Sequence, residues 1–280
     1  MQVSSADLLA AARSHQCAIG AFNVYNLEGV KAVIGAAEAL RSPVMLQIHP
    51  AALTFGERPL IALCLAAADQ AEVPVSVHLD HCSSADTISL ALETGMRSIM
   101  VDGSQLDYET NWAFTSEQTA HIHSRGGVVE AELGRISGSE DGLSVSEREA
   151  RMTDPMLAAD YIAQTGVDML AVCIGNVHGR YRGEVQFDFE RLAAIRKSVS
   201  IPLVLHGTSG VPDDLVRRCI DLGVCKFNVN TELRQAYMNV LRQTHHDLID
   251  VMIAAVAAMQ AVVSDKLRLF NSAGLADTLS

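Results

Sequence analysis

Short apolar segments alternate along most of this chain with longer segments in which apolar residues recur every three or four positions. The short segments are rich in Val, Ile and Phe, which is typical of buried parallel strands, and the longer ones have the period of amphipathic helices. The pattern predicts repeated strand and helix units. The expected strands cover residues 18–25, 44–48, 75–79, 98–102, 128–133, 169–174, 203–205 and 225–229.

Turn residues mark several boundaries of these units. Proline comes just before or at the start of three strands, at Pro43, Pro74 and Pro202, and Gly95 and Gly166 follow helical patterns as expected C-caps, as does Gly223. Eight units favour a closed (β/α)8 TIM barrel over an open doubly wound sheet, and the first strand is not followed by GxGxxG. We therefore expect an α/β protein with a single barrel domain over residues 1–280.

Two segments lie outside the repeat. Residues 135–151 carry glycines, serines and acidic residues and are too long for an ordinary connection, so we interpret them as a candidate active-site lid. Residues 241–280 predict a C-terminal helical extension that packs on a neighbouring chain.

The acidic composition excludes some partners. The net charge is −12, the pI is near 5.2, and the chain has no run of Lys and Arg, so we expect neither nucleic acid nor an anionic membrane to bind. The longest apolar run, near Met252–Met259, is too short to span a bilayer, and no basic and apolar leader follows Met1. The cysteines are scattered without CxxC pairs, which fits reduced core residues and a cytoplasmic protein.

Three histidines stand at the ends of predicted strands. His81 ends the third strand, His178 follows the sixth, and His206 ends the seventh. The carboxyl ends of all strands in such a barrel meet at one face, where the active site lies. One such histidine alone is more often structural, but three neutral imidazoles with an open fourth position suit a catalytic zinc ion that polarises a carbonyl.

Six ordered motifs carry a family resemblance across nearly the whole chain: HLDH, VDGS, VEAELG, GNVHG, LHGTSG and KFNVNTEL. This series resembles the class II ketose-bisphosphate aldolases, closest to the tagatose-bisphosphate aldolase-like branch. The resemblance implies reversible, metal-dependent cleavage of a ketose (bis)phosphate into dihydroxyacetone phosphate and an aldehyde. It also implies one Zn²⁺ per chain, with room for an activating monovalent cation, and a homodimer or homotetramer.

The resemblance also implies roles for single residues. His81, His178 and His206 match the zinc ligands, and Asp80 matches the general acid/base. Two further acidic residues, Asp102 and Glu132, match residues that orient the ligands or contact the metal in an alternative position. Glu140, on the long loop, matches a mobile glutamate that moves a proton at the carbon of dihydroxyacetone phosphate, although the neighbouring Asp141 is an alternative counterpart.

Glycines, hydroxyls and amides at the ends of the last strands predict a phosphate site. The candidates are Gly179, Gly207, Thr208, Ser209, Asn228, Val229, Asn230 and Thr231.

His49, at the end of the second strand, has no counterpart in the common family pattern. It is a candidate for substrate specificity, either as a hydrogen-bond partner of a sugar hydroxyl or, when protonated, as a partner of a phosphate. The sugar itself stays open between tagatose 1,6-bisphosphate, fructose 1,6-bisphosphate and ketose monophosphates.

Three alternatives to this function differ in the residues that they need. An aldolase that forms an imine needs a lysine in the barrel, and only Lys226 falls on a predicted strand, so imine chemistry is disfavoured. A metal-dependent epimerase or isomerase of a sugar phosphate would share the same metal site. A non-catalytic subunit that stabilises an aldolase complex would not need Asp80 and the three histidines.

Overall fold

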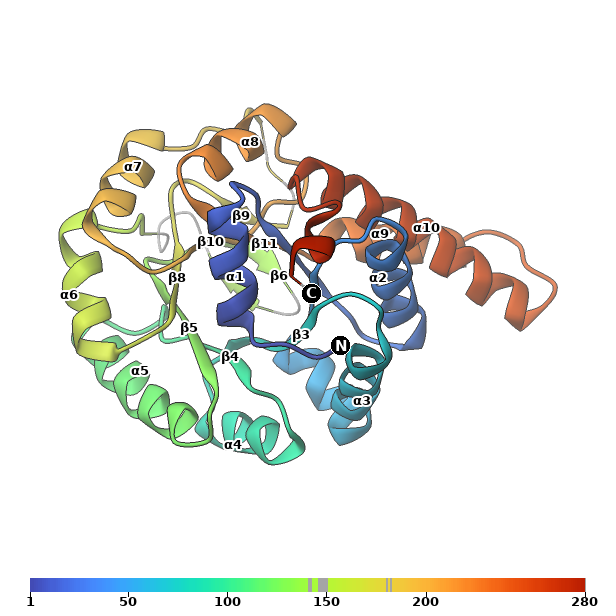
Figure 1. Cartoon of the computed structure of the whole chain (residues 1–280), viewed down its shortest axis with the longest axis horizontal. Helices are drawn as coiled ribbons and strands as arrows, with labels where there is room; N and C mark the ends of the chain where they lie inside the picture. The colour runs from blue at the N-terminus through green and yellow to red at the C-terminus, as the bar shows by residue number, and fades with distance from the viewer. Residues whose placement is uncertain (141–142, 146–150, 180, 182, 280) are drawn as a thin grey trace.

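A computed structural model of the chain describes residues 1–140, 143–145, 151–179, 181 and 183–279. Parallel strands close into an eight-stranded barrel in the order β1, β2, β3, β4, β5, β8, β10 and β11 (Figure 1). The barrel prediction is confirmed. The strands are β1 (Ile19–Asn23), β2 (Val44–Ile48), β3 (Val75–Cys82), β4 (Ser98–Val101), β5 (Val128–Leu133), β8 (Met169–Val172), β10 (Leu203–Leu205) and β11 (Val224–Val229).

Helices surround the barrel and begin where polar side chains can accept hydrogen bonds from the first turn. Asn26, Ser84 and Asp107 each accept from a backbone N–H of the helix that they precede. Gly95 and Gly166 end helices in the left-handed conformation, as expected. The helices are α2 (Leu27–Ala39), α3 (Pro50–Gln70), α4 (Ala85–Thr94), α5 (Tyr108–His123), α6 (Pro155–Thr165), α7 (Phe189–Ser198), α8 (Asp213–Asp221) and α9 (Thr231–Leu241).

Successive strand residues separate into two apolar clusters. On β2, Val44 and Leu46 pack in the layer between barrel and helices, whereas Met45 belongs to a second cluster inside the barrel. On β8, Leu170 and Met169 divide in the same way. Since side chains alternate along a strand, this division identifies which residues face the barrel interior.

The amino-terminal end of the barrel is closed by an apolar plug. Helix α1 (Ser5–Ser14) contributes Leu8 and Leu9 to the interior cluster, and the short helix η1 (Leu275–Thr278) adds Leu275. Figure 1 shows α1 lying across the barrel, with both chain termini near that end. The polar site must therefore open at the opposite end.

The C-terminal extension packs mainly on its own chain. Helix α10 (Leu248–Leu269) lies against α2 and α9 and buries Ala255, Met259, Val263 and Leu267. In Figure 1 its first turns and the preceding loop project away from the barrel. The expected contact with a neighbouring chain stays a prediction for that projecting part.

Two helices, α3 and α10, are long and apolar enough to cross a membrane by length and composition alone. The sequence led us to expect no segment of this length, because that expectation rested on uninterrupted apolar runs alone. It was wrong about the length and composition of these two helices. Helix α3 is broken at Glu57, where φ is 48°, and packs on β2 and β3. In this structure α3 therefore packs on barrel strands, and α10 packs on α2 and α9.

The long segment 135–151 contains strands where the sequence predicted a loop. Strands β6 (Ser137–Glu140) and β7 (Leu143–Val145) form a hairpin, and β6 also pairs with β9 (Val177–His178). The pairing sets Gly138 opposite His178, and a Cβ on Gly138 would come within 2.1 Å of the His178 carbonyl oxygen. The hairpin is therefore held beside one of the three histidines.

Candidate metal centre

The three histidines predicted from the sequence meet at the carboxyl end of the barrel. One ring nitrogen from each of His81, His178 and His206 lies within 4.8 Å of the other two. His206 Nδ1 is 2.9 Å from His81 Nε2, and the His81 and His178 ring centroids are 5.0 Å apart. Three imidazole nitrogens at this spacing can hold one divalent ion.

A backbone irregularity lets adjacent residues Asp80 and His81 both reach this site. The β3 and β4 register shifts between Leu79 and Cys82, and His81 has a φ of 45°, in the left-handed region. In a regular strand the two side chains would point to opposite faces. The bulge turns His81 inward instead, a use of bulges that is common beside active sites.

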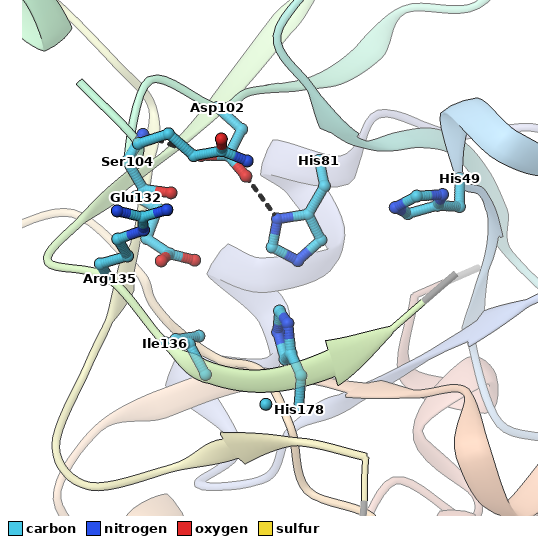
Figure 2. Close-up of a pocket in the computed structure, with 10 residues that line it drawn as sticks. His49, His81, Asp102, Ser104, Glu132, Arg135, Ile136 and His178 are labelled. Atoms are coloured by element: carbon cyan, nitrogen blue, oxygen red, sulfur yellow. Dashed lines mark hydrogen bonds and ion pairs between the residues drawn. The ribbon is translucent and has the colours of Figure 1, made fainter. Parts of the chain in front are cut away.

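Asp102 orients His81. Its Oδ2 atom is 2.7 Å from His81 Nδ1, while Ser104 donates its backbone N–H to Oδ1 at 2.9 Å. Although burial lowers the pKa of His81, the carboxylates of Asp80 and Asp102 outweigh it and raise that pKa well above the usual range. With Nδ1 engaged by Asp102, Nε2 is the ring nitrogen that faces His206. Figure 2 shows the same edge of the His81 ring turned toward His178.

Glu130 orients His206 in the same way as Asp102 orients His81. Its Oε1 atom is 2.8 Å from His206 Nε2, so His206 Nδ1 is the nitrogen presented to His81. Both side chains are completely buried. Glu130 was not among the site residues predicted from the sequence, although alternation along β5 places it on the same interior face as Glu132.

Glu132 lies on the other side of His206. Its Oε2 atom is 3.7 Å from His206 Nδ1, and Cys173 Sγ donates to its Oε1 at 3.6 Å. Burial and the nearby Asp102 carboxylate raise the pKa of Glu132 to about 8. The carboxyl group is thus placed where it could contact an ion held by the histidines.

Asp80 is held by two amides. Asn23 Nδ2 donates to Oδ2 at 2.9 Å, and Asn228 Nδ2 donates to Oδ1 at 3.1 Å. Burial opposes ionisation, but His81, His206 and Lys226 outweigh it and hold the pKa of Asp80 well below its usual range. Asp80 is therefore a buried carboxylate that stays ionised and can accept a proton.

A pocket opens over this cluster, between the strand ends and the β6–β7 hairpin (Figure 2). Figure 2 shows His49 on the opposite side of His81 from Asp102. Ser104, Gln105 and Arg135 line the pocket but were not among the predicted site residues; Ser104 belongs to the VDGS motif, whereas nothing in the local sequence distinguishes Gln105 and Arg135 from other loop residues. The lining residues are His49, His81, Asp102, Ser104, Gln105, Glu132, Arg135, Ile136, Gly138 and His178.

Comparison with known proteins identifies the family. The family model for class II fructose-bisphosphate aldolase matches residues 3–275. A fructose-bisphosphate aldolase from Thermus caldophilus is 38% identical, with 99% of this chain and 100% of that protein covered. The chain belongs to the class II fructose-bisphosphate aldolase family. It is a metal-dependent aldolase that acts on a phosphorylated sugar.

Solved structures agree with this assignment. The crystal structure of a putative fructose-1,6-biphosphate aldolase from Coccidioides immitis has a TM-score of 0.94 and 37% identity, with 98% of each chain covered. The YdjI aldolase from Escherichia coli K12 has a TM-score of 0.89 and 35% identity over 99% of this chain and all of that one. A fructose-bisphosphate aldolase from Campylobacter jejuni, at 22% identity and a TM-score of 0.82 over 97% of this chain and 96% of that one, supports the fold.

The predicted phosphate segments of this aldolase lie together at the ends of β10 and β11. Thr208 Oγ1 donates to the Asn228 carbonyl at 2.8 Å, and Tyr25 Oη donates to Asn230 Oδ1 at 2.9 Å. A Cβ on Gly207 would lie 2.3 Å from the Val177 carbonyl oxygen, and φ there is 64°, so this close approach requires glycine.

Tyr181, which was not among the predicted residues, connects the two loops that carry the predicted phosphate site. It accepts from Val177 N and donates to the Gly207 carbonyl at 2.8 Å. Gly179 has a φ of 89°, and Ser209 and Asn228 are each 7% exposed. Val229 ends β11 and Thr231 begins α9, whose N-terminal N–H groups can bind an anion.

His49 begins α3 in this aldolase, a role that the sequence did not predict. Its Nδ1 accepts from Ala51 N at 3.2 Å, and its ring centroid is 6.3 Å from that of His81. A protonated ring could not accept this hydrogen bond, and a helix N-terminus disfavours a cation. Of the two roles expected for His49, a hydrogen bond from Nε2–H to a sugar hydroxyl therefore fits this geometry better than pairing of a protonated ring with a phosphate.

Glu140 lies at the end of β6, and its side chain is outside the described part of the structure, as is Asp141. The predicted proton-shuttle role of Glu140 stays a prediction.

Proposed function

We propose that this chain cleaves a ketose 1,6-bisphosphate reversibly into dihydroxyacetone phosphate and a phosphorylated aldehyde, with one Zn²⁺ per chain. The observation that carries the proposal is the convergence of three imidazole nitrogens beside the buried carboxyl group of Asp80. Fructose 1,6-bisphosphate is the leading candidate because the Thermus and Coccidioides relatives are named for it. Tagatose 1,6-bisphosphate and ketose monophosphates are the alternatives to test.

His81, His178 and His206 would hold the metal, and the donor set fits zinc. Neutral imidazoles with one open position are a common catalytic zinc arrangement, and two of the three rings are oriented by a carboxylate on the other nitrogen. A bound zinc ion would polarise the substrate carbonyl and offset the negative charge that develops on it.

Asp80 would act as the general base in cleavage. The amides of Asn23 and Asn228 donate to both of its oxygens, which favours the carboxylate form and fixes the direction of those oxygens. In this proposal Asp80 takes the proton from the C4 hydroxyl as the C3–C4 bond breaks, and returns it in condensation. Glu140 would move the proton at the carbon of dihydroxyacetone phosphate.

The β10 and β11 loops would bind the phosphate of the dihydroxyacetone half. Gly179, Gly207, Thr208 and Ser209 offer backbone N–H groups and hydroxyls, and the start of α9 adds a positive helix end. An activating monovalent cation is part of the proposal as a second cofactor besides Zn²⁺.

We further propose a cytoplasmic homodimer or homotetramer. Exposed apolar side chains support the oligomer: Leu248, Ile249 and Ile253 at the start of α10 are 58–70% exposed, and Met238 and Leu241 of α9 are also exposed. Contiguous apolar surface is typical of protein interfaces. Light scattering on the wild type and on Ile253→Lys would test it, with a smaller mass for the variant expected.

A substrate panel tests the proposed reaction. Zinc-loaded protein is incubated with ketose mono- and bisphosphates of defined stereochemistry, and released dihydroxyacetone phosphate is coupled to a reporter reaction. Release from a ketose 1,6-bisphosphate, lost with a chelator and regained with zinc, is expected. Conversion of a sugar phosphate to its epimer without dihydroxyacetone phosphate would indicate the isomerase alternative, and full activity after metal removal would contradict the mechanism.

A further inference from the structure

A buried polar network runs across the barrel beneath the site and centres on Lys226 of β11. Among the lysines of the chain, all of which are described, Lys226 alone is completely buried. Its Nζ donates to Asn228 Oδ1 at 2.7 Å and lies 2.9 Å from Glu130 Oε2. Asn228 in turn is hydrogen-bonded to the proposed acid/base Asp80, and Glu130 is hydrogen-bonded to His206.

The first arm of the network fixes the amide of Asn228. A lysine ammonium can only donate and a carboxylate can only accept. The Asn228 oxygen must therefore face Lys226, and its nitrogen must face Asp80, as the distances of 2.7 and 3.1 Å indicate. If Lys226 were absent, the amide could rotate and Asp80 would lose one of its two amide donors.

The second arm sets the direction of Glu130. Lys226 engages Oε2, which leaves Oε1 to accept from His206 Nε2 at 2.8 Å. That contact keeps the proton of His206 on Nε2 and its Nδ1 lone pair toward the other histidines. The same lysine therefore touches the supports of both functional groups.

We infer that Lys226 is a positioning residue that aligns the acid/base Asp80 with the metal ligand His206, through Asn228 on one side and Glu130 on the other. The inference rests on the proposed roles of Asp80 and His206. It explains why a lysine is kept in the barrel of an aldolase that uses a metal. A fully buried ion pair is a poor source of stability compared with apolar packing, so stability alone does not account for Lys226.

Lys226→Met tests this inference, because methionine fills similar space without the donors. We expect kcat to fall about 100-fold, the scale expected when a reacting group is misplaced by about 1 Å, with a much smaller change in KM. Metal affinity, measured by competition with a chromogenic chelator, is expected to fall about 10-fold or more. Lys197→Met, at an exposed position on α7, is the matched control and should leave both quantities unchanged.

The double variant Lys226→Met/Glu130→Gln separates positioning from simple charge balance. It removes both charges of the buried pair, and the glutamine carbonyl can still accept from His206. Stability and metal affinity should recover toward the wild type, whereas kcat should stay low because Asn228 still lacks its donor. This variant also decides the question if Lys226→Met alone does not fold.

Recovery of kcat to within about threefold of wild type in the double variant would overturn the inference, because Lys226 would then serve only as a counter-ion. An unchanged kcat in Lys226→Met would overturn it as well. Neither result would affect the proposed function, which is tested on the wild-type protein by release of dihydroxyacetone phosphate and by its dependence on the metal.

Discussion

The two ends of the barrel interior are built from opposite chemistry. At the amino-terminal end, α1 inserts Leu8 and Leu9 against Met45 and Met169, and the cluster is apolar. At the carboxyl end the interior is filled by Asp80, Glu130, Lys226 and the histidines, most of which are nearly or completely buried. The interior methionines Met45 and Met169 come from β2 and β8, whereas the buried charged groups come from β3, β5 and β11.

This difference separates stability from function along a single barrel axis. Burial of apolar side chains contributes about 1.5–3 kcal/mol each to folding. Buried charges cost several kcal/mol unless they are paired, so the polar end must be supported by the rest of the barrel. Substitutions at the apolar end should therefore lower the free energy of unfolding and leave turnover unchanged. Substitutions at the polar end should lower turnover and leave the barrel folded.

The largest expected effect is that of His178→Ala. Removing one of three proposed ligands should abolish tight metal binding and with it almost all turnover, while the barrel stays folded. Elemental analysis of the purified variant and its thermal unfolding midpoint in the presence of chelator measure the two parts. Normal metal content would show that His178 is not a ligand.

For Asp80→Asn we expect a reduction in kcat of about 100-fold or more, which is the scale for losing general acid/base catalysis. The metal should remain, since Asp80 lies 4.0 Å from the nearest nitrogen of His81. Turnover and zinc content are measured on the same preparation. A loss of zinc instead would mean that Asp80 organises the metal centre and does not transfer the proton.

Leu9→Ala probes the other end of the barrel. Leu9 is completely buried in the plug, so its truncation should lower the free energy of unfolding by about 2–5 kcal/mol. Denaturant unfolding measures the loss. Metal affinity and kcat per folded, metal-loaded molecule should not change, and a drop in either would show that the two ends are not independent.

The smallest expected effect is that of His49→Thr. Threonine can also begin a helix, so α3 should be retained, while the proposed Nε2–H donor to a sugar hydroxyl is lost. We expect the ranking of kcat/KM among the ketose phosphates to shift by about 3- to 10-fold, the size of one neutral hydrogen bond, at constant zinc content. An equal change for every sugar would assign His49 to the scaffold alone.

Local signals in the sequence were enough to predict the barrel. The apolar period and the glycine and proline boundaries predicted all eight strands within a few residues, because each strand and helix is specified over its own short segment. The strand-end histidines were found for a related reason. A closed parallel barrel brings every strand end to one face, so position in the repeat already predicts proximity.

Only the tertiary structure decided how the site is supported. Lys226 and Glu130 lie 96 positions apart in the sequence, yet their side chains meet inside the barrel, and no local pattern signals that pair. The bulge that turns His81 inward, the hairpin beside His178 and the capping role of His49 likewise depend on register and packing between distant segments. The sequence by itself determined the repeat and the donor residues at its strand ends, because local preferences act within one unit. The closed barrel decided which charged groups are paired, because burial forces each of them to find a partner across the interior.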